Sequence, residues 1–213
     1  MYIKVYKRMY FDIGANIGNW SIENSNNCEK IISVEASPNT FQKLINNTED
    51  YLNILPLNYC VCKTEEEFID FYNCETDTIS TINKDWLVSE KSRFYNNHYE
   101  YNIIKCKTVT LDKLIKEYGE PELIKIDVEG GEFECLKSLT QKVKNICFEW
   151  ASETNDINFA CLDYLETIGY TEFSLQMEDN YTYRPTTYTT ITNIKNDLSK
   201  TTPKEEWGMI WAK

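Results

Sequence analysis

The stretch that most constrains this chain is Met9 to Trp20, which reads Met-Tyr-Phe-Asp-Ile-Gly-Ala-Asn-Ile-Gly-Asn-Trp. Its first half has the apolar character of a buried strand, and Asp12 falls near the carboxyl end of that strand. Gly14 and Gly18 then permit backbone conformations that a side chain would obstruct. The stretch therefore predicts a strand, a tight turn and a helix start, where free backbone N–H groups can meet hydroxyls or phosphates of a ligand.

An acidic residue closes the next predicted strand. Glu35 ends the apolar run that begins at Ile31, about 20 residues after Gly14, and a carboxylate there can accept hydrogen bonds from both ribose hydroxyls. Asn16 takes the place of the second glycine of a dinucleotide fingerprint, which suits a ligand without pyrophosphate. Together these features suggest an adenosyl ligand. The alternatives are a solvated strand-end carboxylate for Glu35 and a helix cap for Asp12.

Strands and helices alternate through residue 170, which predicts an α/β fold with a mostly parallel sheet and helices on both faces. We expect one domain over residues 1–213. Two polar segments, 76–102 and 178–207, lack this periodicity and are candidate lids over the active face. The expected strands are 10–13, 31–35, 54–62, 65–72 at an edge, 123–128, 145–150, 172–177 and 208–212, and the expected helices are 20–27, one opening at 37, 110–118, 132–139 and 159–168.

The composition excludes several classes of protein. A net charge of -12 disfavours nonspecific binding to nucleic acid or anionic membranes. No apolar run reaches the roughly 20 residues of a membrane helix, and the polar start lacks a secretory apolar region, so we expect a cytoplasmic protein. The eight cysteines show no Cys-x-x-Cys spacing and are expected to be core thiols. The oligomeric state stays open.

A second acidic stretch, Lys125 to Glu132, carries the expected chemistry. Alternation places Lys125, Asp127 and Glu129 on one face of a strand end, beside the first strand. Asp127 is therefore our candidate to orient or deprotonate an attacking hydroxyl. Glu149, near the end of the fifth strand, is expected to be its neighbour, and two such carboxylates either share a proton or hold a divalent cation.

Other residues in these segments have simpler interpretations. Glu132 is expected to favour a helix N-terminus, and Lys125 either balances the carboxylates or keeps its head in water. The single histidine, His98, is expected at the surface. Aromatic side chains that could line an acceptor pocket are Trp20, Trp86, Tyr95, Tyr99, Tyr101, Tyr181 and Tyr183.

Four motifs together resemble the FkbM-type methyltransferases. They are Phe-Asp-Ile-Gly-Ala-Asn-Ile-Gly-Asn-Trp-Ser at 11–21, Val-Glu-Ala-Ser-Pro at 34–38, Val-Thr-Leu-Asp at 109–112 and Lys-Ile-Asp-Val-Glu-Gly-Gly-Glu at 125–132. The resemblance implies the Rossmann-like class I S-adenosylmethionine fold, a doubly wound seven-stranded sheet of order 3-2-1-4-5-7-6 with the last strand antiparallel. It also implies cofactor binding by Asp12, Gly14, Ala15, Asn16, Gly18, Glu35 and Ala36.

We therefore expect an S-adenosylmethionine-dependent O-methyltransferase that acts on a small hydroxylated acceptor: a sugar, nucleotide sugar or glycan. Asp127 and Glu149 are the expected catalytic residues, and a divalent cation is a possible second cofactor. Three alternatives stay open: a methyltransferase-like binding or scaffold domain, an RNA methyltransferase, and an NAD-dependent oxidoreductase, the last disfavoured by Asn16.

Overall fold

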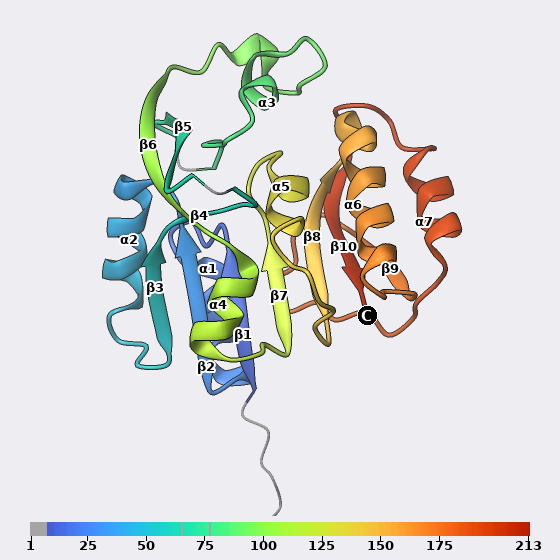
Figure 1. Ribbon diagram of the computed structural model, residues 1–213. Coiled ribbons are helices and arrows are strands. Elements are labelled where there is room, and N and C mark those ends of the chain that lie inside the picture. Colours follow the sequence, from blue (N-terminus) through green and yellow to red (C-terminus); the bar gives the residue numbers. More distant parts are fainter. Residues whose placement is uncertain (1–7, 65, 77) are drawn as a thin grey trace, which may run out of the picture.

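A seven-stranded sheet runs through the computed structural model, which describes residues 8–64, 66–76 and 78–213 (Figure 1). Its strands lie in the order β3-β2-β1-β7-β8-β10-β9, and β10 runs antiparallel to both of its neighbours. Counted within this sheet alone, that is the predicted order. The strands are β1 (Met9–Ile13), β2 (Lys30–Glu35), β3 (Ile54–Asn58), β7 (Leu123–Ile126), β8 (Ile146–Ala151), β9 (Phe173–Met177) and β10 (Trp207–Ala212).

A second, three-stranded sheet lies above the carboxyl ends of the parallel strands, with order β4-β6-β5 (Figure 1). Its strands are β4 (Cys60–Val61), β5 (Phe68–Cys74) and β6 (Tyr101–Val109). The prediction was wrong here in two ways. The expected single strand 54–62 is divided at Tyr59 between the two sheets, and β6 was missed because most of its side chains are polar or partly exposed and show no clear period. The expected edge strand 65–72 overlaps β5, which begins later, at Phe68, and ends later, at Cys74; residue 65 lies outside the described residues.

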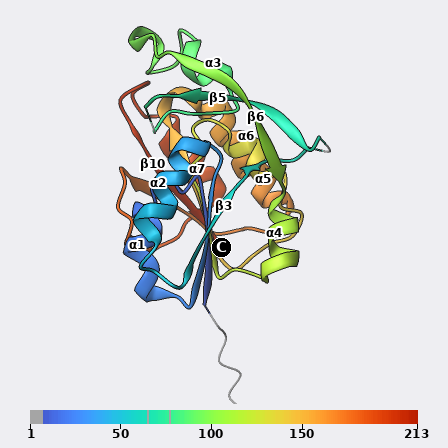
Figure 2. The same cartoon turned by 90° about the vertical axis from the view of Figure 1, so that its left-hand side faces the viewer.

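Helices cover both faces of the main sheet, as Figure 2 shows from its edge: α1 and α2 lie on one side, and α4 and α5 on the other. The α-helices are α1 (Asn19–Asn24), α2 (Pro38–Thr48), α3 (Lys84–Val88), α4 (Leu111–Tyr118), α5 (Glu132–Leu136), α6 (Asn155–Thr167) and α7 (Ile191–Leu198). Short 3-10 turns cover Ser25–Asn27, Tyr95–Asn97 and Ser152–Thr154.

The helices α2 and α4 begin directly after the N-cap residues Ser37 and Thr110. The Ser37 side chain caps α2, whose first residue is proline, and the Thr110 hydroxyl accepts a hydrogen bond from the Lys113 backbone N–H at 3.1 Å. Three helix boundaries differ from the prediction by at least three residues: α1 ends at Asn24 and continues as a 3-10 turn, α5 ends at Leu136, and α6 begins at Asn155. The helix α7 was not predicted, because it lies in the Thr-rich segment 178–207.

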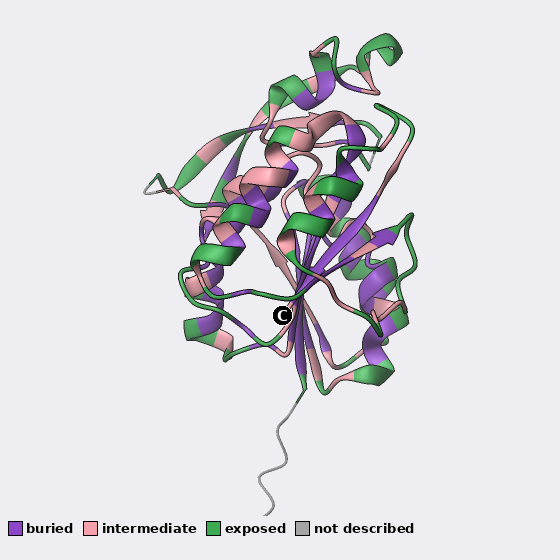
Figure 3. Ribbon diagram, turned by 90° about the vertical axis from the view of Figure 1, so that its right-hand side faces the viewer, coloured by how far each residue is buried: buried purple, intermediate pink, exposed green. Residues whose placement is uncertain are grey.

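Alternation along the strands divides the apolar residues into two cores. Phe11 and Ile13 of β1 point to the larger core, which includes side chains of α4, α5, α6 and α7, whereas Tyr10 points to a smaller core with Trp20 of α1. Figure 3 shows the sheet almost wholly buried between these layers. Seven of the eight cysteines are buried and all are free, as predicted. No α-helix in the described ranges is long and apolar enough to cross a membrane.

Burial in the larger core predicts a large effect of truncating Leu162, whose side chain is fully buried on α6. Leu162→Ala should lower the free energy of unfolding by about 2–5 kcal/mol, because it removes methyl groups and leaves a cavity. Leu52→Ala is the matched control, since Leu52 is 100% exposed, and should change stability by less than about 0.5 kcal/mol. Urea denaturation measures both; equal effects would contradict the packing described above.

Candidate active site

Asp12 and Lys125 are direct neighbours across β1 and β7, on the sheet face that α1 covers. Asp12 is fully buried, and the Ser21 hydroxyl of α1 donates to its Oδ2 at 2.6 Å. Lys125 is also buried, with its Nζ 3.2 Å from Asp12 Oδ1 and 3.3 Å from Asp127 Oδ2. Burial lowers the pKa of Lys125, but the two carboxylates outweigh this effect and raise it, so the ammonium stays charged.

The same ammonium group also holds the loop after β1. Lys125 Nζ donates to the carbonyl of Gly14 at 3.0 Å. Of the two alternatives for Lys125, the structure therefore shows the buried counter-ion and not a head in water. The Lys125 ammonium group thus contacts the Asp127 carboxylate, the buried Asp12 carboxylate and the Gly14 carbonyl.

Glycine is required at two positions of this loop. Gly14 has a φ of +72°, and a Cβ there would lie 1.7 Å from the carbonyl oxygen of Asp127. Gly18, with a φ of +95°, precedes α1, and a Cβ would lie 2.8 Å from Leu44 Cδ1. The glycines therefore let the loop approach the end of β7 on one side and α2 on the other.

Glu35 is held at the end of β2 by two backbone donors. Asn16 N donates to its Oε2 at 3.0 Å and Ser37 N to its Oε1 at 2.8 Å. Asn16 has a left-handed φ of 50°, which asparagine tolerates better than most residues. Burial raises the pKa of Glu35 to about 7, against the lowering effect of the two N–H donors and Lys125. The neighbouring Ala36 carbonyl accepts from Asn58 Nδ2 at 3.0 Å.

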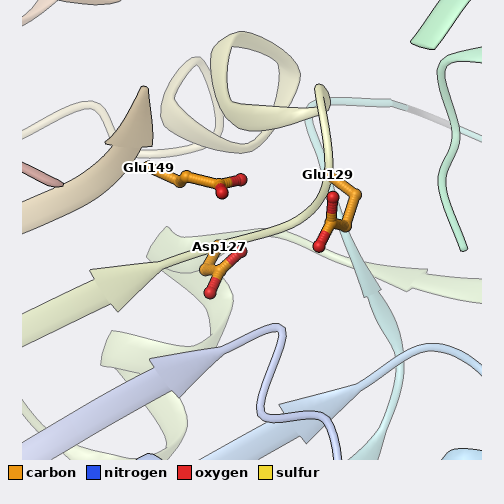
Figure 4. Close-up of side chains that lie close together, drawn as sticks. All are labelled: Asp127, Glu129 and Glu149. Carbon is orange, nitrogen blue, oxygen red and sulfur yellow. The ribbon is translucent and has the colours of Figure 1, made fainter. Parts of the chain in front are cut away.

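Three carboxylates converge at the ends of β7 and β8, as Figure 4 shows. Ile126 pairs with Phe148, so the next residues, Asp127 and Glu149, lie opposite each other. Glu129 joins them, and carboxylate oxygens of the three lie within 4.8 Å of one another. The expected strand alternation is not the reason, since β7 ends at Ile126 and Glu129 reaches the cluster through a left-handed φ of 55°.

Burial and neighbouring negative charges raise the pKa of two carboxyl groups in this cluster. Burial, then Asp127 and Glu129, raise the pKa of Glu149, and burial and Asp127 also raise the pKa of Glu129. Trp86 Nε1 donates to Glu129 Oε2 at 3.1 Å, which stabilises the ionised form. The arrangement can be neutralised in two ways, by a shared proton or by a divalent cation.

The turn that carries Glu129 is fixed from two directions. Glu132 Oε1 accepts from the backbone N–H groups of Val128 and Gly130 at 3.1 and 3.2 Å, so its side chain holds the turn that precedes α5. From the polar segment 76–102, Thr81 Oγ1 donates to the Glu129 carbonyl at 2.6 Å and Asn83 Nδ2 to the Gly130 carbonyl at 3.1 Å. That segment therefore supports the acidic cluster directly.

A cavity of about 550 Å³ joins these parts. Of the predicted site residues, Gly14, Ala15, Asn16, Glu35, Ala36, Asp127 and Glu149 line it, whereas Asp12 and Gly18 lie behind the wall. The predicted aromatic residues divide in the same way: Trp20, Trp86, Tyr99 and Tyr181 line the cavity, and Tyr95, Tyr101 and Tyr183 do not. His98 is exposed, as predicted.

Sequence reasoning missed several cavity residues, among them Arg93, Phe94 and Asp179. Arg93 and Phe94 follow α3 in the segment without periodicity, and Asp179 follows β9. No local pattern in the sequence distinguishes them from surface residues, because their placement depends on where long connections return to the sheet.

Arg184 links the connection after β9 to α1 and to the sheet face that α1 covers. Its Nη2 donates to Asn24 Oδ1 at 2.6 Å, and its guanidinium lies 6.0 Å from the Trp20 ring centroid and 5.4 Å from that of Trp211. Asn24 Nδ2 in turn donates to the Tyr181 carbonyl at 3.1 Å. These contacts hold Tyr181 against the cavity.

Comparison with known proteins gives the family. Residues 12–185 match the methyltransferase FkbM domain, and the chain belongs to that family of methyltransferases. A curated relative, the hexuronic acid methyltransferase AglP of Haloferax volcanii, is 27% identical over 141 residues, which are 65% of this chain and 52% of the relative. The match thus spans about half the length of that relative.

Solved structures of other proteins overlap the chain loosely. The precorrin-6Y C5,15-methyltransferase of Geobacter metallireducens has a TM-score of 0.49 and 13% identity, covering 97% of this chain and 79% of that one. Fibrillarin of Aeropyrum pernix with bound S-adenosyl-L-methionine has a TM-score of 0.46 and 12% identity, covering 97% and 66%. Overlap at this level says nothing about activity.

The raised pKa of Glu35 predicts a pH-dependent stability. Its folded-state pKa of about 7 lies above its ordinary value of 4.5, so its contribution to stability is complete below pH 4.5 and is lost as the pH rises through 7. The free energy of unfolding of the wild type minus that of Glu35→Gln should therefore fall by up to about 3 kcal/mol across this range.

Denaturant unfolding of both proteins between pH 4.5 and 8 measures this difference. Any constant loss from the changed hydrogen bonds to Asn16 and Ser37 shifts the curve without changing its slope. A difference that stays flat, or that rises with pH, would contradict the raised pKa.

Proposed function

We propose that the protein transfers the methyl group of S-adenosylmethionine to a hydroxyl oxygen of a small acceptor, most simply a sugar. The observation that carries this proposal is the placement of Glu35 and the carboxylates Asp127 and Glu149 on the walls of one cavity, at the carboxyl ends of β2, β7 and β8. Open parallel sheets bind ligands at this edge. Membership of the methyltransferase FkbM domain family supports the reaction class.

The residues of the loop fit the proposed cofactor. Each Glu35 oxygen accepts one backbone hydrogen bond, and a carboxylate offers about four acceptor positions, so two ribose hydroxyls can still donate to it. The approach of Gly14 to Asp127 leaves no side chain between the loop and the end of β7. Bound there, S-adenosylmethionine supplies an electrophilic methyl group on a sulfonium.

Asp127 and Glu149 would accept the proton of the acceptor hydroxyl. In the proposed transfer the acceptor oxygen would bond to the methyl carbon as the carbon–sulfur bond breaks, and its proton would pass to a carboxylate oxygen of Asp127 or Glu149. Lys125 fixes Asp127 by a contact of 3.3 Å, and Glu149, with its raised pKa, can retain the proton. Positioning of the two reactants supplies most of the rate in such a site.

Aromatic walls favour a ring-shaped acceptor. Trp86, Phe94 and Tyr99 come together in one apolar cluster above the carboxylates, with ring centroids of Trp86 and Phe94 at 5.4 Å. The sugar acceptor named for the curated relative supports this choice. The acidic walls oppose an RNA acceptor, and Asn16 in the loop opposes a dinucleotide.

We also propose that segments 76–102 and 178–207 act as lids over the cavity. Both contribute cavity residues, Trp86 from the first and Tyr181 from the second. Their closure over bound reactants would exclude water from the transferring methyl group.

The test is transfer of a labelled methyl group from S-adenosylmethionine to a panel of sugars, nucleotide sugars and RNA. Asp127→Asn should bind S-adenosylhomocysteine within about threefold of the wild type and lose about 10²–10⁴-fold in kcat. Glu35→Ala should weaken that binding at least about tenfold, by loss of a charge-assisted hydrogen bond. Glu23→Ala, on the exposed face of α1, is the matched control. Full activity of Asp127→Asn, or no cofactor binding by the wild type, would reject the proposal.

The same assay decides how the acidic cluster is neutralised. If Asp127, Glu129 and Glu149 hold a divalent cation, chelator abolishes transfer and magnesium restores it. If they share a proton, chelator leaves the rate unchanged.

A further inference from the structure

Carboxylates outnumber cations on the walls of the cavity. Of its lining side chains within the described part of the chain, five carry a carboxylate and two a positive charge. The cationic residues are Lys125 and Arg93, and the acidic residues are Glu35, Asp127, Glu129, Glu149 and Asp179.

Both cations are already neutralised by the protein. Lys125 lies between Asp12 and Asp127. Arg93 makes two contacts with Glu153, from Nε to Oε1 and from Nη2 to Oε2 at 2.7 Å, and its Nη2 also donates to the Glu206 carbonyl at 3.0 Å. Because the Glu153 side chain is only 2% exposed, moving Arg93 away would leave a buried charge uncompensated. Neither cation is therefore available to an anionic ligand.

Two of the carboxylates, in contrast, lack a partner. Within the described ranges, the side-chain carboxylates of Glu149 and Asp179 have neither a hydrogen bond nor an ion pair. Glu149 comes from β8 and is half-buried, and Asp179 comes from the connection after β9 and is exposed. The described cavity walls therefore offer two carboxylates without a cationic partner, whereas both cations are already paired.

We propose that the acceptor carries an ammonium group beside its reacting hydroxyl, as in an amino sugar, and carries no carboxylate or phosphate. An ammonium group offers three donors and one positive charge, which match the two unpaired carboxylates. An anionic ring would meet like charges with no free cation to pair with. This inference rests on the proposed function and names a different substrate class from the hexuronic acid in the name of the curated relative.

Three methyl glycosides on the same ring test the inference: the glucosaminide, the glucoside and the glucuronide. Each is titrated by calorimetry into the full chain, with and without S-adenosylhomocysteine, in the presence of chelator so that no divalent cation cancels the negative charge. The glucosaminide should bind at least about tenfold more tightly than the glucuronide, with the neutral glucoside between them.

Asp179→Asn tests the assigned residue without touching the proposed catalytic carboxylates. It should weaken the glucosaminide about three- to tenfold and leave the glucoside unchanged, since only the charged ligand loses an ionic partner. Asp50→Asn is the matched control, because it removes one exposed carboxylate at the end of α2, away from the cavity, and should change neither.

The inference is overturned if the glucuronide binds as tightly as the glucosaminide, if the glucosaminide shows no binding, or if both variants behave alike. Failure of the proposed function is a separate result, the absence of S-adenosylhomocysteine binding, and the ranking of the glycosides without that ligand still decides the present inference.

Discussion

The geometry of the site depends on one buried ammonium group. Lys125 lies directly beside Asp12 in the register of β1 and β7, and its Nζ contacts Asp12, Asp127 and the Gly14 carbonyl at 3.0–3.3 Å. A carboxylate inside a sheet is costly unless it is paired, and removing one partner of such a pair typically costs about 3–5 kcal/mol. The need to neutralise Asp12 therefore also fixes the loop and the end of β7 relative to each other.

The cavity is completed by segments outside the main sheet. Thr81 and Asn83 bind the backbone of the turn after β7, and Arg93 ties the chain after α3 to Glu153. On the α1 face, Arg184 holds the connection after β9 through Asn24. Each of these contacts joins a polar connection to a regular element, so the connections have defined positions although they lack a long helix or a central strand.

The sequence predicted the sheet well and the connections poorly, for physical reasons. Buried parallel strands such as β1 and β2 are mostly apolar, and Gly14 follows the first while Glu35 ends the second, so these strands and the cavity wall at their ends were predictable. The strand order was implied by the resemblance to the FkbM-type methyltransferases. β6 is half-exposed and carries polar residues, which hid it. Glu129 reaches the acidic cluster only through a left-handed turn, and Asp179 reaches the cavity wall only through the path of a long connection.

The central claim is that the loop after β1 and the end of β2 bind S-adenosylmethionine beside Asp127. A crystal structure of the protein with S-adenosylhomocysteine tests it most directly. The account predicts ribose hydroxyls in hydrogen-bond contact with Glu35 and the sulfur on the Asp127 side of the cavity. A ligand bound elsewhere, or one whose ribose makes no contact with Glu35, would contradict it.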